Sequence, residues 1–168
     1  MLIPWEVLCE NSAQSEAFSE KLVEIAAADP LILSEVMRGV LHKEPCIQIQ
    51  AADVVEKVSD RRPAFLMPYK RVILEQLIDI KLVEVRLQVA LFLGRVLWDE
   101  WEMKQVVALL EKWIEMQETE AIVINSLQSL HTLAMQKTWI RPHFLEQLEK
   151  IKEHASVSVQ KIAAELQI

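Results

Sequence analysis

Four segments of the chain share one spacing of apolar residues, and this repetition constrains the fold more than any other feature. The segments are IQIQAADVVEKV (47–58), VRLQVALFLGRV (85–96), IVINSLQSLHTL (122–133) and VSVQKIAAELQI (157–168). In the second segment the apolar residues lie at i, i+4, i+7, i+8 and i+11, which is the stripe of a helix with one buried face. The other three repeat these offsets with more polar substitutions, so each segment predicts such a helix.

A second helix is predicted after each of the first three segments, within residues 59–78, 97–116 and 134–151. Asp99 and Glu102 have the spacing of a capping box, which begins a helix at this point. Pro142 suits a first helical position. Pro68 lies inside its segment, and we expect it to break or kink the helix there because proline has no backbone N–H.

A further helix pair is predicted before these, joined by an Asp29–Pro30 turn. When the segments are aligned, their last stripe residues are Ile25, Val58, Val96, Leu133 and Ile168, at spacings of 33, 38, 37 and 35 residues. Two helices in such a period indicate an α-solenoid, in which each pair buries its apolar face against the next. We therefore predict one domain, 1–168, with repeats at about 12–44, 45–81, 82–118 and 119–155 and a half repeat at 156–168.

The segment EVRLQVALFLGRV (84–96) resembles the first helix of a HEAT repeat, and residues 47–77 resemble a full repeat with its Pro-Tyr turn. The fixed Gly and Tyr of a TPR first helix are absent, and the spacings leave no room for the third helix of an armadillo unit. The resemblance implies an all-α, right-handed superhelix of about four and a half repeats. It also implies that the second helices line a concave face, where such proteins bind other macromolecules.

Several kinds of chemistry are excluded or disfavoured by composition. Two glycines, Gly39 and Gly94, cannot form the glycine-rich loops that hold nucleotides. The four histidines form no zinc-binding pair, so we predict no metal, no cofactor and no catalytic residue, and a protein that is not an enzyme. Cys9 and Cys46 form no CxxC motif, so we expect two unpaired cysteines. We predict neither a signal peptide nor a membrane span, and we therefore expect a cytoplasmic protein.

Charge is distributed unevenly along the chain. The net charge is −7, yet residues 57–97 carry eight Lys or Arg and four acids, whereas residues 98–120 carry seven acids and two lysines. Two adjacent surfaces of opposite sign suit a protein or peptide partner better than nucleic acid, whose charge is uniform. We therefore predict a scaffold or protein-interaction module, and we expect it to bind neither general nucleic acid nor membrane.

Two other classes stay open at this point. A HEAT-like DNA glycosylase would use the basic stretch 57–97 to hold nucleic acid, and a HEAT-like bilin lyase would need a deep apolar cleft. The last helix, 157–168, has an apolar face that could pair with a second copy of the chain.

The predicted binding residues are the cations and the aromatic side chain that we place on the second-helix face. Tryptophan is a favoured anchor at protein interfaces, and basic side chains complement an acidic partner. The predicted set is Arg38, Lys70, Arg71, Trp101 and Lys104.

Overall fold

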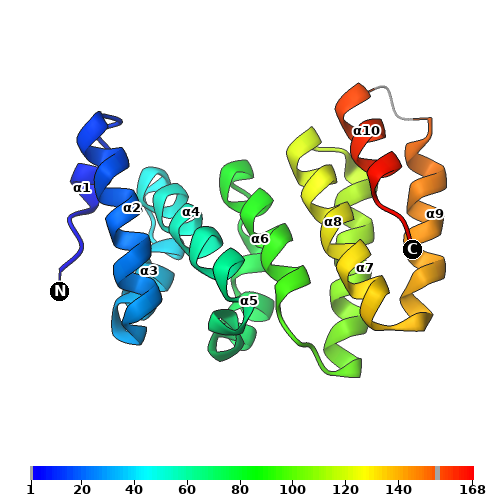
Figure 1. Cartoon of the computed structure of the whole chain (residues 1–168), viewed down its shortest axis with the longest axis horizontal. Helices are drawn as coiled ribbons and strands as arrows, with labels where there is room; N and C mark the ends of the chain where they lie inside the picture. Colours follow the sequence, from blue (N-terminus) through cyan, green and yellow to red (C-terminus); the bar gives the residue numbers. More distant parts are fainter. Residues whose placement is uncertain (1, 154–155) are drawn as a thin grey trace. The chain divides into compact units, whose positions relative to one another are not determined.

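The computed structural model describes residues 2–153 and 156–168, and in these residues the secondary structure is entirely helical (Figure 1). The prediction of an all-α protein is therefore confirmed. The chain divides into two compact units, residues 1–89 and 90–168. Each unit is described by itself, and the prediction of one continuous solenoid domain stays a prediction.

Unit 1 consists of helical hairpins, and the second helix of the hairpin that begins with α4 (Pro45–Arg61) is interrupted by 3-10 segments. Its other α-helices are α1 (Trp5–Leu8), α2 (Ala13–Ala28), α3 (Pro30–Val40) and α5 (Lys70–Glu75), with 3-10 segments η1 (Pro63–Tyr69) and η2 (Leu77–Asp79) around α5. Helix α6 (Val83–Arg95) begins in this unit and continues into the next. Pro68 lies inside η1, so the second helix of this hairpin is broken as predicted.

Unit 2 contains the end of α6 and four longer elements. They are α7 (Glu100–Met116), α8 (Glu120–Gln136), α9 (Arg141–Ile151), preceded by the 3-10 segment η3 (Thr138–Ile140), and α10 (Val157–Glu165). Asp99 accepts from the N–H of Glu102, whose carboxylate accepts from the N–H of Asp99, so the predicted capping box is present. Pro142 occupies the second position of α9, one later than predicted.

Helices pack in two layers within each unit. In unit 1, the first helices α2 and α4 lie side by side, and α3 packs against both of them. In unit 2, α8 lies beside α10 in one layer, α7 lies beside α9 in the other, and α8 packs against both α7 and α9. A helix that is apolar on one face is buried by this arrangement, because each layer covers the other.

The predicted stripes are buried in the central helices. All five stripe residues of α6 (Val85, Val89, Phe92, Leu93, Val96) are fully buried, and so are four of the five in α4, where Ile47 is half-buried. Helix α8 buries all five of its stripe positions, including Ser126 and Ser129. The buried positions of a stripe therefore accept small polar side chains as well as apolar ones.

Both terminal stripes were predicted in the wrong register. In α2 the buried residues are Ser15, Ser19, Leu22, Val23 and Ala26, so the stripe ends at Ala26 and not at Ile25. In α10 all five predicted positions (Val157, Lys161, Ala164, Glu165, Ile168) are exposed, whereas Val159 is buried and Ile162, Ala163 and Leu166 are half-buried. With the corrected ends Ala26 and Leu166, the repeat spacings become 32, 38, 37 and 33 residues.

Gly94 of α6 marks a close approach between α6 and α8 in unit 2. A Cβ atom added at Gly94 would lie 2.6 Å from Ser129 Oγ and 2.8 Å from Ser129 Cα. The Ser129 hydroxyl donates to the carbonyl oxygen of Ala90 over 2.5 Å. The backbone of α6 at Gly94 therefore lies directly against Ser129 of α8, and only glycine at position 94 leaves enough room for this contact.

Replacing Gly94 with alanine should destabilise the protein although alanine is the better helix former. Alanine at an unconstrained helix position gains about 0.5–1 kcal/mol over glycine. Overpacking against the Ser129 backbone costs about 1–3 kcal/mol, so we expect a net loss in the free energy of unfolding, measured by urea denaturation. Ala108→Gly, at an exposed position of α7, measures the intrinsic difference in this chain. A Gly94→Ala variant more stable than wild type would contradict the close approach.

A disulfide joins Cys9, just after α1, to Cys46 in the first turn of α4, with the two Cα atoms 6.0 Å apart. The expectation of two unpaired cysteines is therefore wrong. Its cause lies in the fold, because α1 and α2 both pack against α4 and bring residues 37 positions apart into contact. Sequence spacing alone contains no sign of this proximity.

Removal of the disulfide should destabilise unit 1 and leave unit 2 unchanged. A cross-link that closes a loop of this length restricts the unfolded chain and typically stabilises the fold by about 2–4 kcal/mol. We expect Cys46→Ser to speed amide hydrogen exchange in α2 and α4 while α8 keeps its protection. Wild type in a reducing buffer should match the variant. Equal protection of α2 and α4 in oxidised wild type and variant would refute a stabilising role.

Candidate functional site

Helix α7 presents one exposed stripe beside its buried one. Met103, Val106, Val107, Leu110, Trp113 and Ile114 are buried, which turns Trp101, Lys104, Ala108, Lys112 and Glu115 to solvent. These positions recur every three or four residues, so they share one side of the helix. Trp101 and Lys104, both predicted as binding residues, therefore lie one turn apart on the same exposed stripe of a second helix.

Trp101 differs from the other four tryptophans in its exposure. Its side chain is 72% exposed, whereas Trp98 and Trp113 are buried and Trp5 and Trp139 are half-buried. Trp98 fills the turn before α7 and donates its indole N–H to the carbonyl oxygen of Leu93 over 2.7 Å. Such an exposed indole contributes little to the core, and tryptophan is a favoured anchor residue at protein interfaces.

The three cations predicted in unit 1 are not assembled into a free positive patch. Arg38 on α3 pairs with Glu35 at 2.8 Å, and Arg71 on α5 pairs with Glu75 at 2.8 Å. Lys70, the first residue of α5, is half-buried. Both arginines are thus paired within their own helices, and these exposed pairs are worth little to stability.

Other cations of the basic stretch are paired locally as well. Lys57 pairs with Asp53 and Arg61 pairs with Glu24, each at 2.8 Å. Adding up charges along the sequence therefore overestimates how positive this part of the surface is. The argument for a positive patch at residues 57–97 is weakened by these contacts.

A polar network between α7 and α9 escaped the sequence analysis. Glu111 contacts the His143 ring nitrogen at 3.0 Å, and the fully buried Gln147 donates to Glu111 at 3.4 Å and to Glu115 at 3.1 Å. Lys150 pairs with Glu115 at 2.5 Å. In the sequence, Glu111 and Glu115 are four residues apart on one second helix, and His143 and Gln147 are four residues apart on the next. Only the packing of the helices shows that these two pairs face each other.

The network fixes the position of the second-helix face in unit 2. His143 lies between the Glu111 carboxylate and the Trp139 ring, whose centroid is 5.8 Å from that of the imidazole and whose plane is nearly perpendicular to it. Each of these contacts joins α9 to α7 or to the turn before α9. The C-terminal half of α7 is therefore held against α9 by polar contacts.

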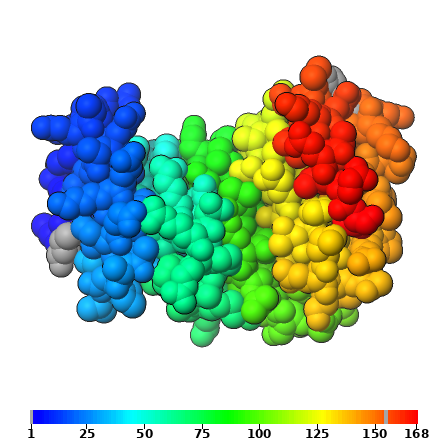
Figure 2. Space-filling view, in the orientation of Figure 1, coloured from blue at the N-terminus to red at the C-terminus, as the bar shows by residue number. Residues whose placement is uncertain are grey.

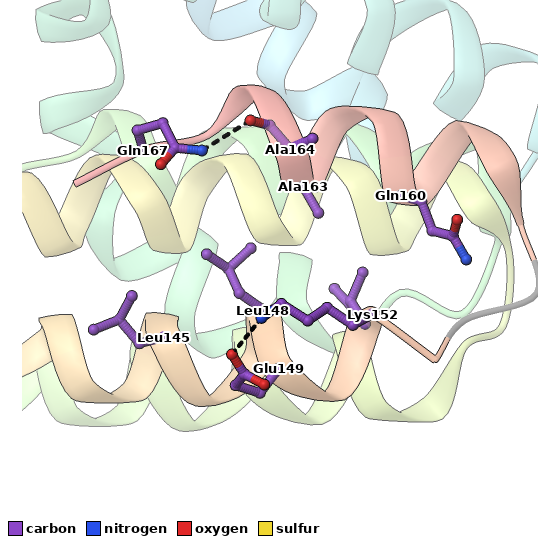
Figure 3. A pocket seen from close by; sticks show the side chains of 9 residues that line it. Leu145, Leu148, Glu149, Lys152, Gln160, Ala163, Ala164 and Gln167 are labelled. Atoms are coloured by element: carbon purple, nitrogen blue, oxygen red, sulfur yellow. Dashed lines mark hydrogen bonds and ion pairs between the residues drawn. The ribbon is translucent and has the colours of Figure 1, made fainter.

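An apolar groove of about 560 Å³ separates α9 from α10 (Figure 3). Leu145 and Leu148 extend from α9 toward α10, and Ala163 and Gln160 point back from α10. Lys152 pairs with Glu149 at the α9 edge, and Gln167 donates to the carbonyl oxygen of Ala164. The sequence analysis placed an apolar face on α10, but of the stripe residues that it predicted there only Ala164 lines this groove.

Within residues 2–153 and 156–168 no group of three or more His, Cys, Asp or Glu side chains is placed to hold a metal ion. No helix among these residues is long and apolar enough to cross a membrane. Comparison of the chain with protein-family models gives no match, and comparison with curated proteins gives none either. The resemblance to HEAT repeats therefore stays an inference from the sequence pattern.

The Glu115 carboxyl should titrate below its ordinary range. The hydrogen bond from Lys150, followed by that from Gln147, lowers its pKa from 4.5. A carboxyl with a lowered pKa adds stability that is present above its unfolded pKa and is lost as pH falls through the folded value. Carboxyl chemical shifts should show the pKa of Glu115 below its ordinary value in wild type and closer to that value in Lys150→Met. An unchanged titration in the variant would show that the Lys150 contact does not form in solution.

Proposed function

We propose that the chain is a protein-interaction module that binds a protein or peptide through its second helices, with Trp101 as the anchor. The exposed indole on α7 is the observation that carries the proposal. Lys104 lies one turn away on the same stripe, and among the described residues it forms no ion pair. An aromatic anchor beside an uncompensated cation suits a partner surface with an apolar pocket and a carboxylate at its rim.

The rigidity of α7 supports this proposal. The capping box fixes its first turn, six buried side chains hold its inner face, and the network with α9 holds its side. Binding to a preformed helix face costs little ordering entropy, so more of the interaction energy is available for affinity. A binding function of this kind requires no catalytic residue.

The HEAT-like solenoid is part of the same proposal. Two-layer packing within each unit, and first-helix stripes that recur every 32–38 residues, are the features such a repeat needs. In a right-handed superhelix of these repeats the second helices would share the concave face. Arg38, Lys70 and Arg71 would then extend the binding face, while Trp101 and Lys104 remain its anchor.

The structure changes the support for two of the sequence predictions, the cellular compartment and nucleic-acid binding. The cytoplasm remains the compartment predicted from the sequence, but disulfides persist mainly in oxidising compartments, so the Cys9–Cys46 bond favours one of those. A nucleic-acid-binding function remains the alternative proposal. It is disfavoured by the local pairing of Lys57, Arg61 and Arg71 with acids.

Capture of partners from a lysate of the source cells tests the proposed function. Removal of an interface anchor typically costs 2 kcal/mol or more, so Trp101→Ala should weaken binding of the captured partner by about 30-fold. Lys104→Glu should also weaken it, more strongly at low salt than at high salt. The control is Met135→Ala, which removes another exposed apolar side chain, 55% exposed, from the first helix α8 of the same unit.

The results of the capture experiment distinguish protein binding through the second helices from nucleic-acid binding. Capture that is lost with Trp101→Ala and kept with Met135→Ala supports the second-helix face. Capture of the same protein by wild type and Trp101→Ala would refute Trp101 as the anchor. Recovery of nucleic acid alone, released by moderate salt, would favour the alternative.

A further inference from the structure

A charged trough runs along the seam between α2 and α4 in unit 1. It consists of two hollows, of about 760 and 300 Å³, which share Glu20 and Lys57 in their linings. The two helices lie side by side in Figure 1, and Figure 2 shows the surface that they form together. This trough belongs to the first helices and lies in a different unit from Trp101, so it is independent of the function proposed above.

The lining of the trough is predominantly acidic. Six acids line it against three cations; the acids are Glu16, Glu20, Glu24, Asp53, Glu56 and Asp60, and the cations are Lys21, Lys57 and Arg61. Arg61 pairs with Glu24 and Lys57 pairs with Asp53. Among the described residues Glu16 and Glu20 form no ion pair, although Lys57 lines the same hollow.

Repulsion between these carboxylates opposes the stability of α2, while the helix dipole favours Glu16 in the first turn. Glu16, Glu20 and Glu24 follow one another at i, i+4 and i+8 on α2, and like charges at this spacing repel each other and destabilise a helix. Packing of α2 does not require them, because its buried stripe consists of other residues. A cationic ligand would turn this repulsion into attraction.

Ser19 is the second observation, and it points to a ligand. The residue is 8% exposed and lines the smaller hollow together with Glu16 and Glu20. Among the described residues its hydroxyl has no hydrogen-bond partner, in contrast to Ser15, whose hydroxyl donates to the carbonyl oxygen of Ser12. Ser19 Oγ is not one of the fully buried polar atoms that lack a partner, so it opens onto the hollow and offers an acceptor to a donor that enters the trough.

The end of the trough is held in place by the disulfide. Leu8 and Gln50 line the smaller hollow, and they lie next to Cys9 and one turn after Cys46 respectively. The Cys9–Cys46 bond therefore ties the end of α1, at one edge of the hollow, to α4. A site with a cross-linked edge loses little entropy when a ligand binds.

We propose that the α2–α4 trough binds a basic segment of another polypeptide, with one lysine or arginine held by Glu16, Glu20 and the Ser19 hydroxyl. Successive carboxylates on α2 are separated by four residues, a rise of about 6 Å. Alternate residues of an extended chain are separated by about 6.6 Å. The repeat of an extended segment with a cation at every second residue therefore matches the rise of α2, with one cation between Glu16 and Glu20 and its neighbours along the acidic lining of the trough.

Fluorescence anisotropy with a labelled (Lys-Ser)5 peptide tests the proposal on the full, oxidised chain. Wild type should bind it with an affinity that falls as salt rises, and should not bind (Glu-Ser)5. Glu16→Gln with Glu20→Gln should weaken binding at least tenfold. The double variant should fold as well as wild type, since it removes repulsion within α2, and circular dichroism checks this.

Two further variants distinguish a built site from general attraction to an acidic protein. Glu153→Gln with Glu165→Gln removes the same charge from exposed positions in unit 2 and should leave the affinity unchanged. Ser19→Ala changes no charge and should weaken binding about threefold or more. Equal weakening by the two double variants, or unchanged binding by Ser19→Ala, would overturn the proposal.

Discussion

Burial of one narrow stripe on each first helix is the constraint on which the rest of the structure depends. The stripe has to pack against a neighbouring first helix on one side and against second helices on the other. Residues at these positions are therefore apolar or small, as the fully buried stripe of α6 and the buried serines of α8 show. Of these two serines, Ser129 donates to the carbonyl oxygen of Ala90, whereas the Ser126 hydroxyl has no hydrogen-bond partner among the described residues.

Small residues decide how closely the helices approach. Added Cβ atoms would collide with Ser129 at Gly94 and with Trp5 and Ala51 at Gly39, and these are the two glycines of the chain. Trp5 therefore takes the space beside α3 that a larger side chain at position 39 would fill. Both glycines lie inside helices, where glycine is unfavourable, because the packing of the neighbouring element requires it.

The first and second helices expose different kinds of side chains. Second helix α7 exposes an indole and a lysine above a network of acids, amide and imidazole. First helices α2 and α4 expose carboxylates along their seam, with a nearly buried hydroxyl below them. Both surfaces combine a polar pattern with a rigid helical support, and this combination allows a protein to select a partner with little change in its own structure.

The sequence by itself determined the helical class, the alternation of first and second helices and the capping box at Asp99. These features depend on residues within a few turns of one another, so local periodicity and capping chemistry suffice to predict them. Only the tertiary structure decided the register of α2 and α10, the Cys9–Cys46 bond, the α7–α9 network and the α2–α4 trough. In α2 two serines hide the buried stripe from a search for apolar residues, and in α10 a shift of two residues turns the helix to its opposite face. The disulfide, the network and the trough join residues about 30 or more positions apart, and their proximity follows from helix packing, which the sequence of a single helix does not specify.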